Sequence, residues 1–318
     1  MKQSVIKKIK NPYAVCLLAV FCCALWGSAF PVIKIGYKLL DISSGDYSSQ
    51  ILFAGIRFTF AGIFTIIIGS IIAKKLITIK PKGYYKVCAL SLFQTVLQYL
   101  FFYIGLAKTT GTKSSILDST SVFFSVLIAS LLLKQERLTA KKIAGCIVGF
   151  AGVVIINLTN GFADSSISFI GEGFIIISAL SYAVSSVMIK RFSADENPVA
   201  LSGYQFILGG IIMIVFGFAL GGRLSITSYK AVLLLAYLAL LSAIAYTVWG
   251  ILLKYNDVSK VTVFGFMTPV FGCLLSAVLL KESLAGSVMK TVISLLLVCF
   301  GIFLVNSNLN ISRKNYES

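Results

Sequence analysis

The stretch Ala24-Leu-Trp26-Gly-Ser28-Ala-Phe-Pro31-Val-Ile-Lys34 lies inside the first long apolar run of the chain. A soluble helix would show a polar stripe here, yet the only interruptions are an indole, a Gly-Ser pair, a proline and a closing lysine. A weaker version of the pattern recurs later as Tyr182-Ala-Val-Ser-Ser-Val-Met-Ile-Lys190. Two copies of one apolar design predict a membrane protein with an internal repeat.

Composition supports this interpretation. Of the 318 residues, 58% are hydrophobic and 12% are charged, whereas soluble domains carry about a quarter charged residues. The net charge of +17 could indicate a nucleic-acid partner. The lysines, however, cluster in short segments between apolar runs, which is typical of cytoplasmic loops, and no basic tract with interleaved aromatics accompanies them. We therefore expect a lipid bilayer as the surroundings and no nucleic acid as a partner.

Ten apolar runs have about the length that a bilayer-crossing helix needs. Their continuity predicts helices rather than a barrel, whose strands would alternate in polarity. The predicted fold class is therefore an all-α polytopic membrane protein with ten transmembrane helices, over residues 13–34, 48–73, 84–106, 114–133, 139–158, 170–190, 199–220, 230–253, 259–280 and 286–306.

The basic residues predict the orientation of these spans. With the N-terminus inside, 18 of the 28 lysines and arginines fall in inner segments, so the positive-inside rule predicts both termini in the cytoplasm and a multi-pass protein of the cell membrane. The predicted organisation is a cytoplasmic tail (1–12), a first five-helix repeat (13–158), an external connection (159–169), a second repeat (170–306) and a second cytoplasmic tail (307–318).

The two halves match at a nearly constant spacing. Tyr99 maps onto Tyr246 and Ser121 onto Thr268, both 147 positions later, while Arg57-Phe58 maps onto Gln205-Phe206. Because each half has an odd number of spans, the second must enter the membrane from the opposite side. Such an inverted repeat is common in secondary transporters, whose binding site lies near the midplane between the halves.

Four segments carry a resemblance to a known family: Leu25-Trp26-Gly27-Ser28-Ala29-Phe30, Arg57-Phe58, Gln98-Tyr99, and Leu-Lys-Gln-Glu136-Arg-Leu138-Thr. In this order they resemble the EamA family of the drug/metabolite transporter superfamily, over about residues 14–158 and 171–306. The resemblance implies an exporter or permease of small metabolites, often amino acids, that works by alternating access. One segment departs from the family pattern, with Lys281-Glu282-Ser283 in place of a fuller Gly-Glu-Arg form.

Arg57 is the most costly residue to place in a membrane, so a functional role is the default expectation. Asp118 lies at a similar predicted depth. A permanent Arg57–Asp118 pair joining two helices and a role facing the substrate both remain open. If transport is coupled to protons, Asp118 is the candidate carrier.

Polar and aromatic residues in the middle of the spans are the candidates for lining a substrate cavity. For the aromatic residues the alternative is ordinary packing, and for the glutamines it is hydrogen bonding between helices. Pro31 and Pro269 are candidates for kinks or gates. The full candidate set for substrate binding is Trp26, Ser28, Arg57, Gln94, Gln98, Tyr99, Asp118, Tyr182, Tyr246 and Trp249.

Gly145 and Gly149 form a GxxxG pattern, which predicts a close helix contact either within the chain or across a homodimer. Glu136 and Glu282 close the fourth and ninth spans beside basic residues and are predicted to anchor loops by ion pairing.

The sequence does not favour an enzyme. Histidine is absent, the seven cysteines fall in apolar runs without a CxxC, and no carboxylate pair has a useful spacing. We therefore expect no metal, no cofactor and no catalytic residues, and a small molecule as the substrate. The alternatives within transport are a nucleotide-sugar, lipid-linked or drug-like substrate; a membrane scaffold or membrane-embedded enzyme is the alternative outside it.

Overall fold

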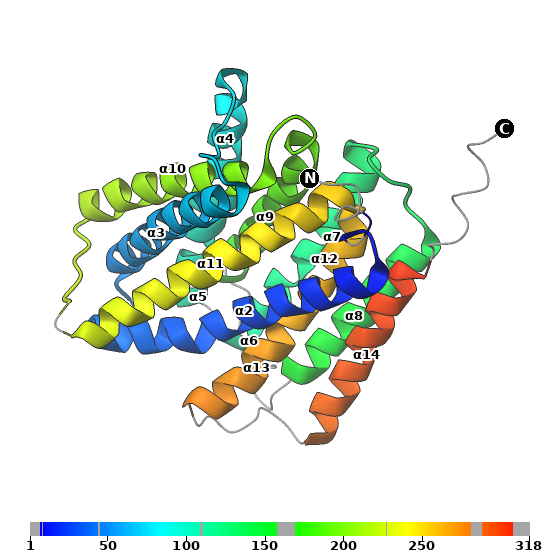
Figure 1. Ribbon diagram of the computed structural model, residues 1–318. Coiled ribbons are helices and arrows are strands. Elements are labelled where there is room, and N and C mark those ends of the chain that lie inside the picture. Colours follow the sequence, from blue (N-terminus) through cyan, green and yellow to red (C-terminus); the bar gives the residue numbers. More distant parts are fainter. Residues whose placement is uncertain are drawn as a thin grey trace.

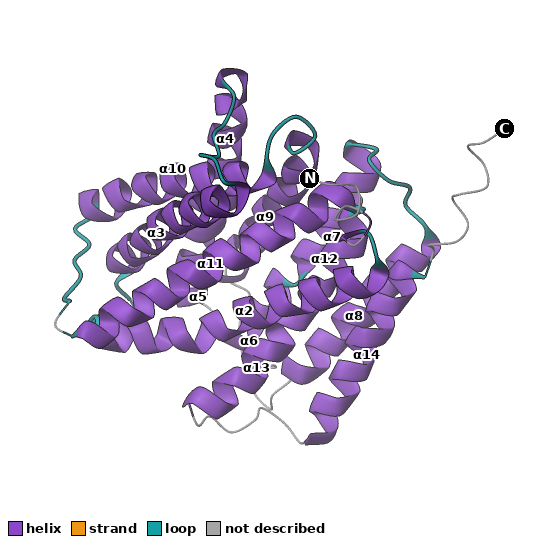
Figure 2. Ribbon diagram, viewed as in Figure 1, coloured by secondary structure: helices purple, strands orange, loops and turns teal. Residues whose placement is uncertain are grey.

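The computed structural model describes residues 7, 9–43, 45–108, 111–157, 169–226, 228–280 and 288–307, and every regular element in these ranges is a helix (Figure 2). The first half contains α2 (Pro12–Leu39), α3 (Tyr47–Ala73), η1 (Pro81–Gly83), α4 (Tyr84–Leu90), η2 (Ser91–Leu97), α5 (Gln98–Lys108), α6 (Gly111–Asp118), α7 (Thr120–Leu127), η3 (Ile128–Leu132) and α8 (Ala140–Asn157). The second half contains η4 (Phe169–Gly173), α9 (Phe174–Phe192), α10 (Pro198–Ala219), α11 (Tyr229–Tyr255), α12 (Val258–Thr262), η5 (Val263–Phe266), α13 (Met267–Leu280) and α14 (Val288–Asn306).

These elements join end to end into the ten predicted spans, which confirms the fold class. Among the described residues, seven helices are long and apolar enough to cross a membrane, and shorter apolar helices over Ile116–Leu132 and Val258–Gly272 belong to the fourth and ninth spans. The elements from α6 to η3 form the fourth span, and those from α12 to α13 form the ninth. These two repeat-related spans are therefore each divided into shorter helical segments. Divided helices are a recurring feature of transporter repeats.

Local sequence explains where several helices begin. Asn11 accepts a hydrogen bond from the backbone N–H of Tyr13, and Asn197 does the same for Val199. Each asparagine precedes a proline at the first helical position, where a missing N–H costs nothing. The Asn-Pro pairs thus start α2 and α10 in the same way.

The packing exchanges helices between the two halves. The repeat-related helices α3 and α10 lie side by side along their length, as do α8 and α14 (Figure 1). Helix α2 packs against α11 and α13 of the second half, and α9 packs against α5 and α7 of the first half. This crosswise pattern is what an inverted repeat produces, since each half supplies the same surface to the other.

Glycines allow these equivalent helices to approach closely. A Cβ on Gly145 would lie 2.7 Å from the carbonyl oxygen of Gly301, and one on Gly301 would lie 2.6 Å from the backbone nitrogen of Gly149. The GxxxG pattern of span five is therefore used within the chain, against α14.

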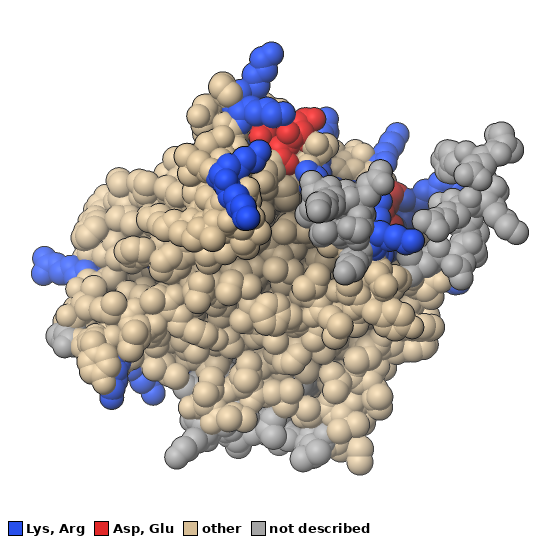
Figure 3. All heavy atoms as spheres, in the orientation of Figure 1, with Lys and Arg blue, Asp and Glu red and all other residues tan. Residues whose placement is uncertain are grey.

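The surface matches a bilayer environment. Large apolar side chains are exposed along the helices, including Ile72, Phe218 and Phe303. Figure 3 shows most of the visible lysine and arginine side chains at the top of the molecule and a few at its left edge and lower left, with a broad uncharged surface between them. The protein is thus an integral membrane protein, and the end of the molecule at which α4 lies (Figure 1) is its lysine-rich end.

We expect Gly301→Ala to destabilise the protein. The added methyl group would press on the backbone of α8, which cannot move aside as a flexible side chain can, and such overpacking costs about 1–3 kcal/mol. Thermal unfolding in detergent measures the effect. Gly250→Ala in α11 is the control, because its Cβ would meet no atom closer than 3.5 Å; equal losses in the two variants would contradict this interpretation.

Candidate functional site

An aromatic cluster lies between the two halves, near the middle of their helices. The ring of Trp26 on α2 lies 4.9 Å from that of Trp249 and 5.1 Å from that of Tyr246, both on α11. It also meets Tyr182 on α9 edge-on at 6.4 Å. The two first helices of the repeats therefore bring their matching residues, Trp26 and Tyr182, into contact.

Polar atoms in this cluster lack internal partners. The indole N–H groups of Trp26 and Trp249 and the side-chain Oε1 of Gln98 are all buried without a hydrogen bond to any described residue. Buried polar groups in proteins are normally hydrogen-bonded, so such orphans mark a place where another molecule can bond. Three of the predicted site residues thus share one property that ordinary core packing does not explain.

The repeat symmetry is visible in a second group of rings beside the first. The hydroxyls of Tyr99 and Tyr246, which occupy equivalent positions, form a hydrogen bond of 2.7 Å. Phe58 packs on Tyr99 at 4.3 Å, Phe206 packs on Tyr246 at 4.9 Å, and the two phenylalanines stack at 5.2 Å. Phe58 and Phe206 were absent from the predicted site, although the match of Arg57-Phe58 to Gln205-Phe206 pointed to them.

Arg57 lies next to these rings and is 3% exposed. Its Nε and Nη2 donate to the hydroxyl of Ser242 on α11, at 3.2 and 2.9 Å, and its guanidinium lies 5.0 Å from the ring centre of Phe58. Among the described residues, no carboxylate lies within ion-pairing distance of Arg57. Of the two alternatives left open for Arg57 and Asp118, the permanent pair is thus not formed in this structure: Asp118 ends α6, and similar depth in the membrane did not bring the two side chains together.

Gln94 serves the helix framework. Its Oε1 accepts a hydrogen bond from the side-chain N–H of Gln205 at 3.1 Å. The hydroxyl of Thr95 donates to the Oε1 of Gln205 at 2.7 Å. Gln94, Thr95 and Gln205 are all buried. This network joins η2 to α10, as the alternative of hydrogen bonding between helices predicts.

Ser28 also lies in a helix contact. Its hydroxyl bonds the carbonyl of Leu25 and the hydroxyl of Tyr237 on α11, both at 2.7 Å, and Tyr237 is exposed on the outer surface. Ser28 thus joins α2 to α11 on the side away from the aromatic cluster.

The two prolines occupy buried positions inside helices. Pro31 has no N–H, so the carbonyl of Gly27 loses its usual helical donor, and this occurs where Gly27 packs closely on Phe271 and Gly272 of α13. Pro269 lies in α13 itself. The predicted gating pair therefore lies along the α2–α13 contact between the halves.

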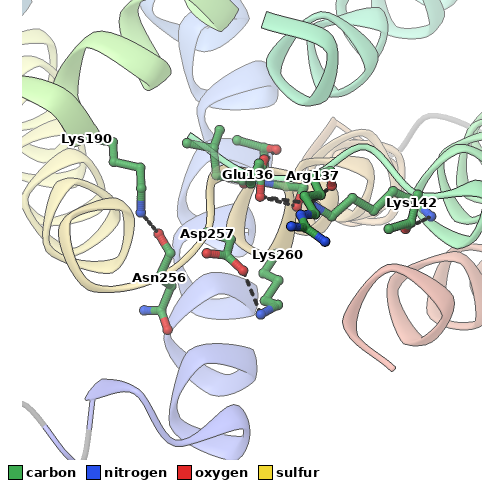
Figure 4. Close-up of polar contacts among 11 residues, drawn as sticks. Glu136, Arg137, Lys142, Lys190, Asn256, Asp257 and Lys260 are labelled. Atoms are coloured by element: carbon green, nitrogen blue, oxygen red, sulfur yellow. Dashed lines mark hydrogen bonds and ion pairs between the residues drawn. The ribbon is translucent and has the colours of Figure 1, made fainter. Parts of the chain in front are cut away.

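A polar cluster joins the halves at the lysine-rich end (Figure 4). Glu136, after the fourth span, accepts hydrogen bonds from the backbone N–H and the hydroxyl of Ser259, at 2.9 and 2.7 Å, at the start of the ninth. Lys142 pairs with the same carboxylate at 3.0 Å. The anchoring role predicted for Glu136 is confirmed, while Glu282 lies outside the described residues.

Two further contacts complete this polar cluster. The ammonium of Lys190, at the end of α9, donates to the backbone carbonyl of Asn256, just after α11. Lys260 pairs with Asp257 at 2.6 Å. Burial alone would raise the pKa of Asp257, but the hydrogen bond and charge of Lys260, aided by Lys190 and Lys142, lower it below its ordinary value.

Comparisons with known proteins agree with this architecture. The sequence pattern of the EamA-like transporter family matches residues 14–158 and again residues 169–307. An "Uncharacterized transporter" of Archaeoglobus fulgidus is 29% identical over 88% of this chain and 94% of its own. YvbV of Bacillus subtilis, also named an uncharacterized transporter, is 29% identical over 92% and 91%.

Two further matches widen the comparison. An Escherichia coli protein named "Probable amino-acid metabolite efflux pump" is 24% identical over 85% of this chain and 88% of its own. A solved crystal structure superposes with a TM-score of 0.74 at 18% identity, over 93% of this chain and 97% of that one. The last match shows a shared fold.

Acid should remove the stabilisation that Asp257 provides. A carboxylate with a lowered pKa stabilises the fold above its ordinary pKa of 3.8, and this contribution is lost as the pH falls through the lower folded value. The unfolding midpoint of Asp257→Asn should therefore lie below that of the wild type at pH 7, and the difference should shrink as the pH falls below 3.8. Asp41→Asn is the control, since Asp41 has no ion pair among the described residues; a constant gap for Asp257→Asn would contradict the assignment.

Proposed function

Because this chain belongs to the EamA-like transporter family, within the drug/metabolite transporter superfamily, we propose that it exports small metabolites such as amino acids across the cell membrane by alternating access. The observation that carries the proposal is the aromatic cluster of Trp26, Tyr182, Tyr246 and Trp249, which both repeats build together. A site shared by two inverted halves can be exposed to either side when one half rocks against the other.

The chemistry of the cluster suits a small amphipathic solute. Aromatic faces attract an ammonium group through cation–π interaction and bury apolar side chains. The unbonded N–H groups of Trp26 and Trp249 and the free Oε1 of Gln98 supply donors and an acceptor for the polar part. The direction, outward, follows the name of the Escherichia coli relative.

The lysine-rich end is proposed as the cytoplasmic end, in accordance with the positive-inside rule. The chain just before α2 lies at this end, where the carbonyl of Ile9 accepts a hydrogen bond from the side chain of Asn256 at 3.4 Å, and ten spans bring the chain back to the same side. The two hydrogen bonds from Ser259 to Glu136 join the halves here. Opening towards the cytoplasm would have to break them.

Removing the indole of Trp26 should impair transport. In proteoliposomes loaded with a panel of radiolabelled amino acids, we expect Trp26→Ala to lower the initial flux at least tenfold and Trp26→Phe to lower it less, because Phe keeps a ring but no N–H. Phe216→Ala, on the exposed face of α10, is the control. Wild-type flux in a folded Trp26→Ala variant would remove this cluster from the transport path.

The Glu136 contact can be tested separately. In Glu136→Gln the backbone N–H of Ser259 loses its bond to a charged acceptor, and charge-assisted bonds are about twice as strong as neutral ones. Hydrogen–deuterium exchange over Val258–Thr262 should therefore become faster. Exchange that is unchanged in the variant would show that Glu136 does not hold this end closed; Asp46→Asn, which caps α3 elsewhere, is the control for general loosening.

A further inference from the structure

The repeat symmetry extends to the surroundings of Arg57. Arg57 and Gln205 are equivalent residues, and so are their partners Ser242 and Thr95, which are 147 positions apart like Tyr99 and Tyr246. Arg57 bonds Ser242 at 2.9 Å, and Gln205 bonds Thr95 at 2.7 Å. Arg57 of the second span thus meets a hydroxyl of the eighth span, and its equivalent, Gln205 of the seventh span, meets a hydroxyl of the third.

The two sites differ in how far their polar groups are satisfied. Gln205 has a second partner, Gln94, so both ends of its amide are bonded. The residue equivalent to Gln94 in the other half is Leu241, which is apolar. Arg57 carries five N–H donors and a full charge, yet the acceptors that it meets among the described residues are hydroxyls, those of Ser242 and Tyr103, and none is a carboxylate.

A buried cation without a counter-ion is expensive, and a partner that arrives from outside removes the cost. The hydroxyl of Tyr37 is also buried without a hydrogen bond to any described residue, and it lies close enough to Arg57 to feel its charge. Tyr103 lies beside both. Arg57 and Tyr37 thus supply hydrogen-bond donors and a positive charge in one place, which is what an anion-binding site requires.

We propose that Arg57, with Tyr37 and Ser242, binds the carboxylate of the transported solute; this inference rests on the proposed transport function. The guanidinium fork matches a carboxylate in geometry and charge. One cation balances one negative charge, so the site fits a monocarboxylate better than a sugar nucleotide with two phosphates. The neighbouring rings of Phe58, Tyr99 and Tyr246 then receive the remainder of the solute.

The test compares acids with their amides. L-leucine and L-phenylalanine, together with their carboxamides, are offered to proteoliposomes, and the same four compounds are tested for thermal stabilisation of the detergent-solubilised protein. The wild type should prefer each acid over its amide at least tenfold in flux. Arg57→Gln should lose this preference while its flux of the amide changes little, and Arg57→Lys should keep part of it.

Matched hydroxyl variants control for structure. Ser242→Ala should weaken the acid preference because the guanidinium loses the group that orients it. Thr95→Ala, at the equivalent position in the other half, should affect stability but leave the ratio of acid to amide unchanged. The stability of each variant is followed by its unfolding midpoint.

The outcomes separate the two proposals. If the wild type moves acids and amides equally, and Arg57→Gln leaves that ratio unchanged, the carboxylate site is overturned while transport stands. If nothing in the panel is moved, but the acids stabilise the wild type and not Arg57→Gln, the transport of amino acids fails and the carboxylate site stands. If neither flux nor stabilisation distinguishes the acids, and chloride in place of gluconate stabilises only the wild type, the counter-ion is inorganic and the inference is overturned.

Discussion

Close backbone contact between α3 and α10 holds the two repeats in register. A Cβ on Gly62 would lie 2.5 Å from the carbonyl oxygen of Gly203, and one on Gly55 would lie 2.7 Å from the backbone nitrogen of Ile214. Only helices without side chains at these points can come so near. This close approach stacks Phe58 on Phe206. It also places Arg57 against α11 of the second half and Gln205 against η2 of the first half. The aromatic cluster and the surroundings of Arg57 therefore both depend on it.

Much of the fold could be predicted because bilayer length and backbone hydrogen bonding leave few choices. Ten apolar runs, an odd number per half and a constant spacing of the matched residues predicted an inverted repeat of helices. The segmentation of the ninth span could not be predicted, because Val263 stands in a stretch as apolar as its neighbours, whereas the fourth span divides at the polar run Asp118-Ser119-Thr120-Ser121. The break at Val263 arises from packing between helices, which apolarity does not report.

The site was predicted unevenly for a similar reason. Four aromatic residues that the sequence singled out near the helix middles, Trp26, Tyr182, Tyr246 and Trp249, lie together in the structure. The partner of Arg57 could not be chosen from the sequence, because depth along a helix says nothing about the direction in which a side chain points. The repeat offset carried the missing information: counting 147 positions from Thr95 leads to Ser242, and the same offset from Gln94 leads to Leu241, which marks the asymmetry between the halves.

The hydroxyl pair of Tyr99 and Tyr246 has a consequence for how firmly a solute is held. The two hydroxyls bond each other at 2.7 Å, so a solute group that takes the place of one of them exchanges one hydrogen bond for another. The number of hydrogen bonds at this point therefore changes little on binding, and the gain in free energy is small. A carrier has to release its solute on the other side of the membrane. Because Tyr99 and Tyr246 can bond each other again when the solute departs, its release leaves neither hydroxyl without a hydrogen bond.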